Sequence, residues 1–469
     1  MHDYKLLIGG AFVDGAGSID VVNPATEQTI ARCPVANEAQ LNQAVAAAKA
    51  AFPAWSALPL SARAKLIDAV ADRLFERQDE FARLLTAEQG KPGPQAIYEI
   101  MGTVFTLKAF AGMQIKSRSL RETPENRVFE HRTPLGVVAA ITPWNFPLIL
   151  LVNKLGPALL AGNTMVLKPA PTTPLTTILF SEICAEFLPA GVVNVICDKN
   201  DLGGLLSTHK DVAKIAFTGS TVTGKKVMQS AAGGIKRVTL ELGGNDAAIV
   251  LDDADPLLVA QKVFDGAMVN AGQVCVAIKR AYVPTGLYDS FCDELARLAK
   301  AMVVGDGAEQ GTQMGPVQNK AQYEKLKEFL ADANANGNVI AGGAPLDRPG
   351  YFIPPTIVRD VPDDARIVRE EQFGPILPVM SYTKLEDVIA RVNDSDYGLA
   401  GTVWGQDIER AIAVAQRVDS GTVWVNQHMA IDAEIPFRGC KQSGLGAELG
   451  EDGLYEYTQA KIVNAVPLQ

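Results

Sequence analysis

A chain of 469 residues is too long for one hydrophobic core, so we expect two large domains with accessory segments. Hydrophobic residues make up 48% and charged residues 20% of the sequence, which is typical of a soluble globular protein. The formal net charge of −10 opposes attraction to nucleic acid or to an anionic membrane, so neither partner is expected.

Neither a signal peptide nor a membrane span is predicted. The first twenty residues are polar at their start and broken by glycines, and the apolar run at 147–160 contains Asn153 and Lys154. The cysteines and the four histidines are scattered, without metal-ligand spacing or the pattern of a secreted disulfide scaffold. We therefore expect a cytoplasmic enzyme with reduced thiols and no metal. The cysteines are Cys33, Cys184, Cys197, Cys275, Cys292 and Cys440.

The amino-terminal part of the chain predicts hairpins followed by helices. Residues 3–35 contain short apolar runs separated by Gly-Gly, Asp-Gly and Asn-Pro turns, which is typical of hairpins or edge strands. Asn37 can cap a helix that runs to Ala51, and Ser61 can cap a longer helix with apolar residues at helical spacing. Gly90 marks the stop of this helical region.

A polar excursion follows the next predicted helix, at 97–114. Residues 117–134 are polar, carry arginines and end in an alternating pattern, so within a monomer they would be poorly anchored. We expect this segment to pair outside its own domain, which favours a homo-oligomer, either a dimer or a tetramer. The tail at 454–466 has strand-like pieces at 455–457 and 462–463.

From Gly136 the pattern alternates between buried apolar runs and helices. This alternation predicts a parallel sheet covered by helices, as in a doubly wound nucleotide-binding fold. Ligands of such folds bind at the carboxyl ends of the strands. The predicted strands are 137–141, 165–167, 192–196, 213–217 and 238–242, with helices at 147–160, 175–187 and from Thr221.

A second alternation begins at residue 247 and predicts a second α/β domain. Its expected strands are 247–251, 280–283, 402–404 and 421–425, and its helices are one opened by Asp255 and three at 288–302, 386–393 and 408–418. We therefore divide the chain into a cofactor domain (1–116 and 135–243), a catalytic domain (244–442) and bridging segments (117–134 and 443–469).

Two segments carry residues suited to covalent acyl chemistry. Residues 240–245 read Leu-Glu-Leu-Gly-Gly-Asn, a strand that delivers Glu241 into a glycine turn, and residues 272–275 end a helix and release Cys275 into a loop. A general base and a nucleophile are the pair that this chemistry requires. Taken alone, each residue has a simpler explanation, as a solvated strand-end carboxylate or a small buried thiol.

A glycine-rich turn and an amide-bearing segment add to this pair. Residues 219–224 follow a predicted strand and open a helix, where glycine lets the backbone approach a phosphate and the helix N-terminus favours its charge. The spacing departs from Gly-x-Gly-x-x-Gly, so by itself it leaves open a plain strand-to-helix turn. Residues 141–147 read Ile-Thr-Pro-Trp-Asn-Phe-Pro and place Asn145 between two aromatic rings.

With these four segments the chain resembles the aldehyde dehydrogenase superfamily, and the match runs in order through nearly all of its length. The resemblance implies an α/β fold with a Rossmann-type cofactor domain, a second α/β catalytic domain and a small oligomerisation sheet. It implies NAD(P)-dependent oxidation of a small-molecule aldehyde to a carboxylic acid. The family uses a segment at the place of 117–134 in an oligomer-forming sheet.

The resemblance also implies the catalytic roles. Cys275 attacks the aldehyde carbonyl, and the amide of Asn145 together with the backbone N–H of Cys275 stabilises the oxyanion. Hydride then leaves for the nicotinamide, and Glu241 activates the water that hydrolyses the thioester. Relatives that transfer the acyl group to coenzyme A generally lack this glutamate, so hydrolysis is favoured. No basic residue occurs at 269–278, so thiol activation is expected from helix ends, backbone donors and the cofactor's charge.

The same resemblance implies a cofactor site. Lys168 is expected to bond the adenosine ribose, Glu371 the nicotinamide ribose, and Phe373 to pack by the ring. Relatives committed to NAD often carry an acidic residue at the position of Pro171, so NAD is slightly favoured and NADP stays open. The implied cofactor-binding residues are Ile141, Thr142, Pro143, Trp144, Lys168, Gly219, Ser220, Gly224, Leu242, Glu371 and Phe373.

The resemblance implies that Phe146 and Phe437 line the substrate tunnel, and Ile431 is expected there because it lies on the loop at 427–437 that should form the tunnel mouth. As a bare sequence feature Phe146 fits a core aromatic equally well. Arg438 stands where most relatives have glycine, and two roles stay open for it: contact with an anionic substrate end, or a salt bridge to Asp432 or Glu434.

Three alternative functions are weighed beside the leading one. A CoA-acylating dehydrogenase would need added coenzyme A, and a thiol hydrolase pairing Cys275 with His209 or His428 would need no cofactor. A catalytically idle structural protein is disfavoured, because Cys275, Glu241 and Asn145 are all present. The sequence does not identify the aldehyde, since one methylene changes preference by only about 1 to 3 kcal/mol.

Overall fold

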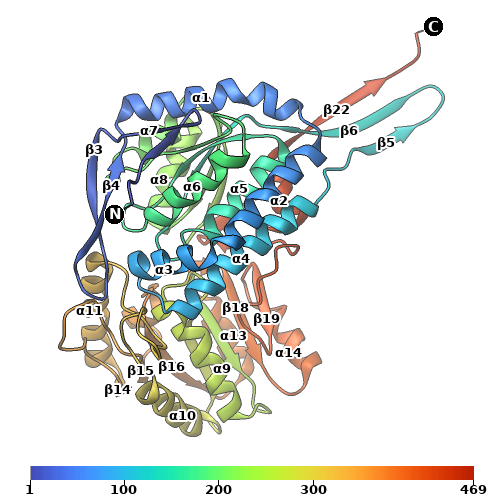
Figure 1. The fold of residues 1–469 in the computed structure, drawn as a ribbon. Coiled ribbons are helices and arrows are strands. Elements are labelled where there is room, and N and C mark those ends of the chain that lie inside the picture. Colours follow the sequence, from blue (N-terminus) through green and yellow to red (C-terminus); the bar gives the residue numbers. More distant parts are fainter. Residues whose placement is uncertain (1, 469) are drawn as a thin grey trace.

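The chain is built around two large sheets, which lie one above the other in the computed structural model of the protein (Figure 1). The structure describes residues 2–468. The upper, eight-stranded sheet has the order β2-β1-β9-β8-β7-β10-β11-β21, and the lower, seven-stranded sheet has the order β14-β15-β16-β13-β12-β18-β19. Both predicted α/β units are therefore present, and the expected fold class is confirmed.

The upper sheet has a parallel centre. Its five central strands are β9 (Val193–Val195), β8 (Thr164–Lys168), β7 (Val137–Ile141), β10 (Val212–Thr218) and β11 (Arg237–Glu241). The antiparallel edges are β1 (Leu6–Ile8), β2 (Ala11–Val13) and β21 (Gly444–Leu445). Strand order reverses between β7 and β10, which makes this gap the topological switch point where ligands of open α/β sheets bind.

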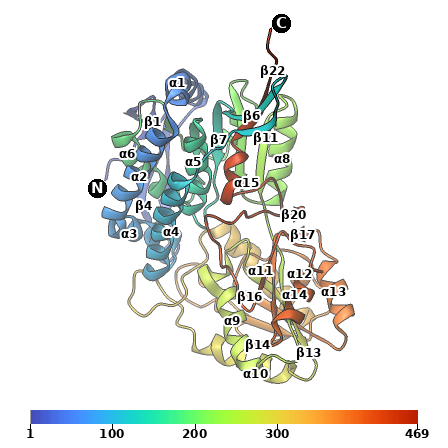
Figure 2. The ribbon, with the colours of Figure 1, turned by 90° about the vertical axis from the view of Figure 1, so that its right-hand side faces the viewer.

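The register of these strands brings three predicted site residues, Ile141, Lys168 and Glu241, to one edge. Ile141 pairs with Lys168 across β7 and β8, and Phe217 of β10 pairs with Ile141 on the other side. Thr218, the last residue of β10, pairs with Glu241 of β11. The carboxyl ends of the central strands therefore lie side by side at the edge that faces the lower sheet (Figure 2).

Helices cover both faces of the upper sheet, with α2 and α4 on one side and α8 on the other (Figure 2). They are α1 (Glu38–Ala57), α2 (Leu60–Glu76), α3 (Gln78–Gln89), α4 (Gly93–Gly112), α5 (Ile149–Ala161), α6 (Leu175–Phe187), α7 (Gly203–Thr208) and α8 (Thr221–Ala232). Asn37 caps α1 through a reciprocal pair of hydrogen bonds with Gln40, as its residue type predicts.

The predicted Ser61 cap is wrong. Helix α2 already begins at Leu60, so Ser61 lies inside its first turn. Pro59 occupies the cap position, with extended backbone angles (φ −55°, ψ 145°). The single long helix expected after Ser61 is also divided, because Arg77 leaves helical geometry (φ −101°, ψ 13°) and separates α2 from α3. Gly90 then ends α3 in the left-handed conformation, as predicted.

The lower sheet is parallel except at its β14 edge. Its strands are β14 (Asn338–Ala341), β15 (Thr356–Arg359), β16 (Ile376–Tyr382), β13 (Ile278–Pro284), β12 (Asp246–Val250), β18 (Ala400–Trp404) and β19 (Thr422–Val425). Its helices are α9 (Pro256–Met268), α10 (Tyr288–Ala301), α11 (Lys320–Asn336), α12 (Arg366–Arg369), α13 (Leu385–Asn393) and α14 (Ile408–Ala415). The sequence pattern left 303–385 without elements, so α11, α12 and three strands were missed.

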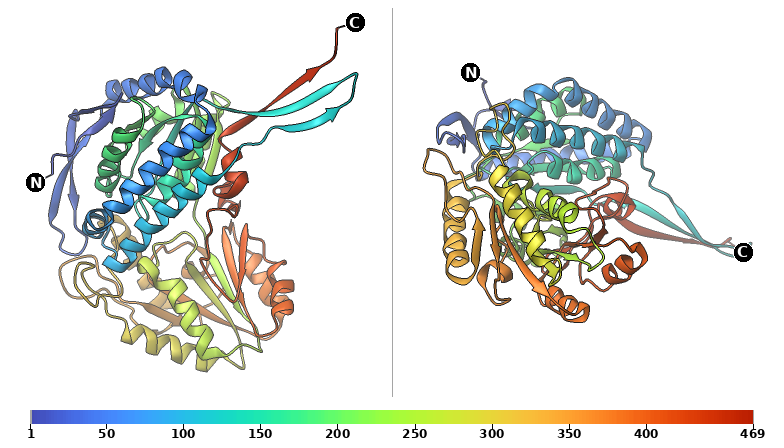
Figure 3. Two further views of the ribbon diagram at one scale, coloured as in Figure 1. Left: turned by 45° about the vertical axis from the view of Figure 1, so that its right-hand side comes forward. Right: turned by 90° about the horizontal axis from the view of Figure 1, so that it is seen from below.

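A three-stranded antiparallel sheet projects from the body as an arm (Figures 1 and 3). It consists of β5 (Arg118–Glu122), β6 (Arg127–Pro134) and β22 (Thr458–Ala465), and β22 pairs with β6 along its whole length. The strand expected at 455–457 is wrong, because α15 (Gly450–Tyr455) occupies the first of these residues and packs on α5. The short pieces β3 (Gly17–Val22), β4 (Thr29–Val35), β17 (Tyr397–Gly398) and β20 (Cys440–Lys441) complete the chain.

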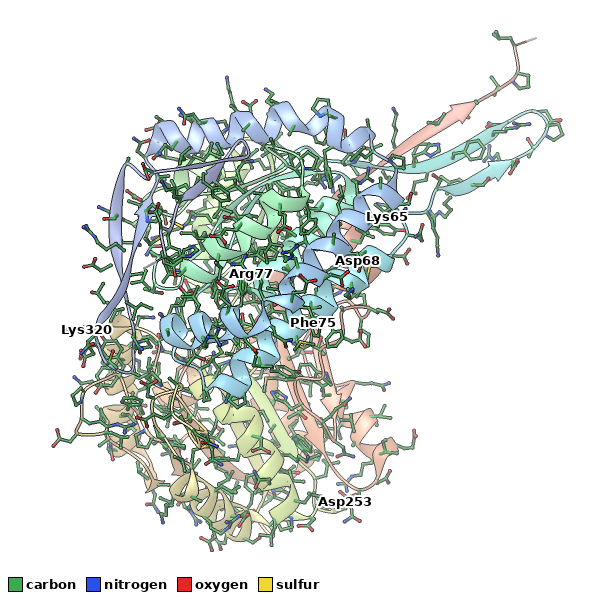
Figure 4. All side chains as sticks on the ribbon, in the orientation of Figure 1. Lys65, Asp68, Phe75, Arg77, Asp253 and Lys320 are labelled. Carbon is green, nitrogen blue, oxygen red and sulfur yellow. The ribbon has the colours of Figure 1, made fainter. Side chains whose placement is uncertain are left out.

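Side chains fill the space between the helices and the sheets, while residues such as Asp68 and Phe75 lie on the outer side of α2 (Figure 4). Phe110 of α4 is fully buried, and a Cβ at Gly156 of α5 would lie 2.7 Å from its ring, so α4 and α5 pack closely only because residue 156 is glycine. Burial of one such ring contributes about 1.5 to 3 kcal/mol. No helix in the described range 2–468 is long and apolar enough to cross a bilayer.

Candidate active site

Cys275 lies in a sharply turned loop between α9 and β13. After α9 ends at Met268, Asn270 and Ala271 adopt left-handed backbone angles (φ 52° and 55°), and Gly272 follows at φ 69°. Such angles are rare for residues with a side chain and cost on the order of 1 to 3 kcal/mol. A Cβ at Gly272 would lie 2.3 Å from the carbonyl oxygen of Gly374, so glycine is required there. The helix end predicted before Cys275 is present.

Buried amide side chains hold this turn in place. The Nδ2 of Asn270 donates to the backbone carbonyl of Asn145 (3.2 Å), and the Nε2 of Gln273 donates to the carbonyl of Asn270 (2.8 Å). The Oε1 of Gln273 accepts the backbone N–H of Gln318 (2.8 Å). The loop of Cys275 is therefore tied to the segment that carries Asn145.

The loop opens into a pocket at the switch point of the upper sheet. The pocket holds about 670 Å³ of empty space, part of it open to solvent. Segments that follow the carboxyl ends of β7, β10 and β11 line it together with the loop of Cys275 and the segment of Glu371. Its lining residues are Pro143, Trp144, Asn145, Leu150, Thr218, Gly219, Ser220, Leu242, Gly243, Cys275, Gln322, Lys325, Glu371 and Phe373.

Most of the predicted cofactor residues therefore meet in one pocket, but four lie outside its lining. Ile141 and Thr142 are buried at the end of β7, and Lys168 is buried at the end of β8. Gly224 lies on α8 beneath Leu242, and a Cβ at this position would lie 2.4 Å from a methyl carbon of Leu242. This glycine therefore lets α8 approach the strand that carries Glu241.

Two hydrogen-bond donors belong to Asn145 and Cys275, which line the pocket together. The buried amide of Asn145 donates one of its two hydrogens to the carbonyl of Gln273 (Nδ2 to O, 2.9 Å), which leaves the second free. Within residues 2–468 the backbone N–H of Cys275 donates to no protein acceptor. These are the two donors that the resemblance assigns to an oxyanion.

A buried ion pair behind Asn145 was not predicted from the sequence. The ammonium of Lys91 lies 2.5 Å from Oε2 of Glu99 and donates to the backbone carbonyl of Asn145 (2.9 Å). It also lies 3.7 Å from the ring centre of Phe146. Glu99 in turn accepts the backbone N–H of Leu148 (3.0 Å). Lys91 and Glu99 thus fix the backbone on both sides of Phe146.

The thiol of Cys275 is half-buried, and its surroundings oppose ionisation. Burial raises its pKa to about 12, and the negative charges of Glu241, Glu371 and Asp246 act in the same direction. The positive charge of Lys279 opposes this rise in pKa. The expectation that no basic side chain acts on the thiol is therefore wrong, because Lys279 stands one residue beyond the segment that was considered.

Glu241 is buried beside the pocket, and its Oε1 has no hydrogen-bond partner in the described structure. Burial and the nearby carboxylate of Glu448 raise the pKa of Glu241 well above its usual value, while Lys154 opposes the rise. Lys154 lies 2.5 Å from Oε1 of Glu448 and donates to the hydroxyl of Thr218 (2.5 Å), a pocket residue. The carboxyl of Glu241 therefore loses its proton less readily than an exposed glutamate does.

The start of helix α8 faces the pocket with groups suited to an anion. Ser220 caps the helix by accepting the backbone N–H of Thr223 (3.3 Å), and Gly219 precedes it at the end of β10. The free N–H groups and the dipole of a helix N-terminus favour a phosphate. The pocket therefore fits the pyrophosphate of a dinucleotide.

The segment of Glu371 closes the other side of the pocket. Oε1 of Glu371 accepts the backbone N–H of Gly244 (3.0 Å), and a Cβ at Gly243 would lie 2.3 Å from Oε2. Phe373 has a left-handed backbone (φ 54°), and its ring meets that of Trp144 edge-on at 5.3 Å. The strained backbone thus directs an aromatic ring into the pocket.

Lys168 makes a contact that the sequence did not indicate. Its ammonium lies 2.7 Å from Oδ1 of Asp198, and both side chains are buried. Asp198 follows β9 and also accepts the backbone N–H of Leu202 through Oδ2 (3.0 Å). The positive charge at the end of β8 is therefore already paired.

Apolar side chains gather on the far side of Cys275. One small apolar cluster is packed by Cys275 together with Phe146, Met429 and Phe437. Ile431, which lies two residues after Met429, is half exposed. The buried members of that cluster are Val274, Val276, Ala277, Leu399, Ala400 and Trp424. Two of the three predicted tunnel residues thus lie together near the sulfur.

The predicted partners of Arg438 are wrong. Its guanidinium pairs with the carboxylate of Asp452 and not with Asp432 or Glu434, because α15 brings Asp452 alongside. Both side chains of the pair are about half exposed, so it contributes at most about 1 kcal/mol. With its charge paired, Arg438 is not directed at the pocket.

Neither histidine of the hydrolase alternative hydrogen-bonds the sulfur of Cys275 in the part of the chain described. The Nε2 of His428 donates to the carbonyl of Val276 (2.7 Å), and burial lowers its pKa to about 4, so it is neutral. His209 lies at the end of α7, where its Nδ1 accepts the N–H of Asp211. Among residues 2–468 no three His, Cys, Asp or Glu side chains gather to hold a metal ion.

Comparisons with known proteins agree on one family. A family model described as the aldehyde dehydrogenase family matches residues 12–463. The putative aldehyde dehydrogenase DhaS of Bacillus subtilis (strain 168) is 39% identical, covering 98% of this chain and 95% of that protein. The succinate-semialdehyde dehydrogenase [NADP(+)] GabD of Escherichia coli (strain K12) is 38% identical, with 97% and 96% covered. A solved NAD+ complex of an aldehyde dehydrogenase from Bacillus cereus superposes with a TM-score of 0.97, at 39% identity, covering 99% of this chain and 97% of that one.

Proposed function

This chain belongs to the aldehyde dehydrogenase family, and we propose that its pocket oxidises an aldehyde through a covalent bond to Cys275. The protein is an NAD(P)-dependent aldehyde dehydrogenase, an oxidoreductase. One observation carries the residue assignment: Cys275 and Asn145 line the same pocket as the start of α8 and Glu371. A nucleophile, oxyanion donors and a dinucleotide site thus lie within one enclosure.

The first half-reaction uses the sulfur and the two free donors. The thiolate of Cys275 adds to the aldehyde carbon, and the carbonyl oxygen becomes an oxyanion within reach of the Asn145 amide and the Cys275 N–H. Donors fixed in advance for such a charge are worth about a hundredfold or more in turnover each. The nicotinamide of bound NAD(P) supplies the hydride acceptor. The residues of the chain orient the carbonyl and hold the resulting thioester.

The second half-reaction uses Glu241. Once deprotonated, its carboxylate takes a proton from water, the hydroxide adds to the thioester carbon, and the C–S bond breaks to release a carboxylic acid and the Cys275 thiolate. The charges of Glu448 and Lys154 act on Glu241, and Lys154 also donates to the hydroxyl of the pocket residue Thr218. Hydrolysis therefore depends on a carboxyl whose raised pKa makes it a stronger base than an exposed glutamate.

The test of this function is product formation without coenzyme A. We expect repeated turnovers that yield reduced cofactor and free carboxylate in equal amounts when only an aldehyde and NAD or NADP are added. A panel of aliphatic, aromatic and charged aldehydes, followed by absorbance of the reduced cofactor, makes this measurement. Turnover that begins only on addition of coenzyme A would contradict hydrolysis. The relatives found give the acyl-transfer alternative no support.

For the cofactor we propose a preference for NAD. The support is the buried pair of Lys168 and Asp198, since the carboxylate consumes the charge that a 2′-phosphate would need near the adenosine ribose. The same panel, run with both cofactors, should give the higher kcat/KM with NAD. Asp198→Asn is expected to lower the ratio of affinities for unphosphorylated over 2′-phosphorylated adenosine nucleotides by about tenfold. Fluorescence titration with both kinds of nucleotide measures this ratio. An unchanged ratio would contradict this role of Asp198.

We further propose that Phe146, Ile431 and Phe437 border the aldehyde's path to Cys275. The apolar cluster shared by Phe146, Phe437 and the sulfur supports this for two of them, and Ile431 lies on the loop that would form the mouth. A largely apolar approach favours an aldehyde with an uncharged chain next to the carbonyl.

The chain is also proposed to act in the cytoplasm as a homo-oligomer of two or four copies. The arm of β5, β6 and β22 supports assembly, because it extends away from the body and exposes apolar residues, among them Ile462 and Leu120 (Figure 3). A reducing compartment suits a reaction that needs a free thiol. Light scattering of the purified chain should give a multiple of 50.0 kDa, and a single-chain mass at micromolar concentration would contradict assembly.

A further inference from the structure

Lys279 is a charged residue that contacts the loop of Cys275 and that the proposed reaction does not use. It lies on β13, four residues after Cys275, and its side chain is buried. Its neighbour Arg280 points to the other face of the strand, where the guanidinium donates to the carbonyl of Asn245 (2.9 Å). Lys279 alone of the two therefore faces the loop.

The ammonium of Lys279 has three partners, and all belong to the pocket or its loop. It donates to the carbonyl oxygens of Val274 (2.8 Å) and Cys275 (2.6 Å). Its third partner is Oε1 of Glu371, at 3.4 Å. Two hydrogen bonds and one ion pair therefore hold the ammonium in place.

The contact with Val274 acts on the peptide group that contains the reacting N–H. The carbonyl of Val274 and the N–H of Cys275 belong to one planar trans peptide, so they point in opposite directions. A cation that holds this carbonyl on the strand side therefore directs the N–H of Cys275 towards the pocket. Hydrogen bonding at the carbonyl also polarises the peptide and strengthens its N–H as a donor.

We propose that Lys279 is a positioning residue for the oxidation: it holds the Val274–Cys275 peptide so that its N–H meets the oxyanion, and it stabilises the Cys275 thiolate. This inference rests on the proposed role of Cys275 as nucleophile. Lys279 also neutralises part of the charge of Glu371, which would otherwise repel a thiolate in the same pocket.

The charges around the thiol come from four elements and agree with this role. Glu241 ends β11, Asp246 begins β12, and Glu371 precedes β16, and each of these carboxylates raises the pKa of Cys275. Lys279 on β13 is the cation that lowers it. Removing this charge leaves the thiol facing three acidic groups, so ionisation must become harder.

The test compares Lys279→Met with a matched control, Lys214→Met. Lys214 is equally buried, but it lies near the start of β10, where its ammonium bonds Thr239 (2.6 Å) and Glu456 (3.3 Å), at the end of the strand remote from Thr218 and the pocket. Both substitutions remove a buried cation and keep an unbranched side chain. Each is expected to lower the melting temperature, so stability alone cannot separate them.

The first readout is alkylation of the cofactor-free protein by iodoacetamide across pH, followed by mass spectrometry of the peptide that carries Cys275. Lys279→Met should react at least about tenfold more slowly at pH 9, equivalent to a rise of about one pKa unit, and its reaction profile should shift to higher pH. Lys214→Met should follow the wild-type profile. Counting only this peptide keeps the exposed Cys440 from contributing.

The second readout is turnover. Lys279→Met should lower kcat for aldehyde oxidation by about tenfold to a hundredfold while the KM for the cofactor changes by less than about threefold, because a misdirected oxyanion donor affects the transition state. If Lys279→Met does not fold, Lys279→Gln removes the charge with less loss of polar contact and carries the same comparison.

The outcomes separate this proposal from the proposed function. Wild-type activity that survives alkylation of Cys275 would overturn the nucleophile assignment itself. If alkylation abolishes wild-type activity, but the folded Lys279 variant matches wild type in both the alkylation profile and kcat, the positioning role of Lys279 is wrong. A slower alkylation together with a lower kcat, absent in Lys214→Met, supports it.

Discussion

Replacing Cys275 by alanine is expected to abolish aldehyde-dependent reduction of NAD and NADP, with kcat lowered by more than about a thousandfold. Without the sulfur no thioester can form, and the remaining donors of Asn145 and the loop have no covalent intermediate to stabilise. The measurement is the initial rate of absorbance change with the best aldehyde of the panel. Cofactor binding should persist, because the residues at the start of α8 and at Glu371 are untouched.

Cys440→Ala is the matched control for this experiment. Cys440 is a free and exposed cysteine on β20, and it does not line the pocket. Its removal should leave the rate within about twofold of wild type, as is usual for surface substitutions. Wild-type rates in Cys275→Ala, or loss of activity in Cys440→Ala alone, would refute the assignment of the nucleophile.

Replacing Glu241 by glutamine should separate the two half-reactions. Glutamine has nearly the same shape but cannot accept the proton of water, so hydrolysis of the thioester should slow by about 10² to 10⁴-fold. Attack by Cys275 and hydride loss do not require this base. Rapid mixing should therefore show a first burst of reduced cofactor, close to one per active site, followed by very slow turnover.

The pH dependence of wild-type turnover should also report the protonation of Glu241. Burial and Glu448 raise the pKa of Glu241, so the proton stays on the carboxyl until the pH exceeds this raised value. Steady-state turnover should fall as pH falls through the raised pKa, while the burst in Glu241→Gln should lack this dependence. A steady-state rate in Glu241→Gln equal to that of wild type would exclude Glu241 as the base.

Much of the fold could be predicted because its signals are local. Buried apolar runs predicted the five central strands of the upper sheet to within about two residues of the observed β7 to β11. Asp255 followed by Pro256 predicted the start of α9, and the structure has Asp255 as its cap. Elements at 303–385 were missed, because α11 is largely polar on its outer face and its cap, Asn319, lies in a segment without a clear apolar period.

The candidate site was predicted only where its residues form short motifs. Cys275, Asn145 and Glu371 each lie in a recognisable segment, and the structure brings them to one pocket. Lys279, Lys91 and Asp198 could not be found this way, because the contacts that place them near the site join residues distant in the sequence or run to the backbone. A lysine inside an apolar segment was the one available signal, since a buried cation needs a partner.

The measurement that tests the central claim most directly is the mass of the peptide containing Cys275 after Glu241→Gln is mixed with aldehyde and cofactor and quenched in acid. The account predicts that this peptide gains the mass of the aldehyde less two hydrogens, in an amount that matches the burst of reduced cofactor. A full burst with this peptide unmodified, or with the adduct on another cysteine, would contradict it.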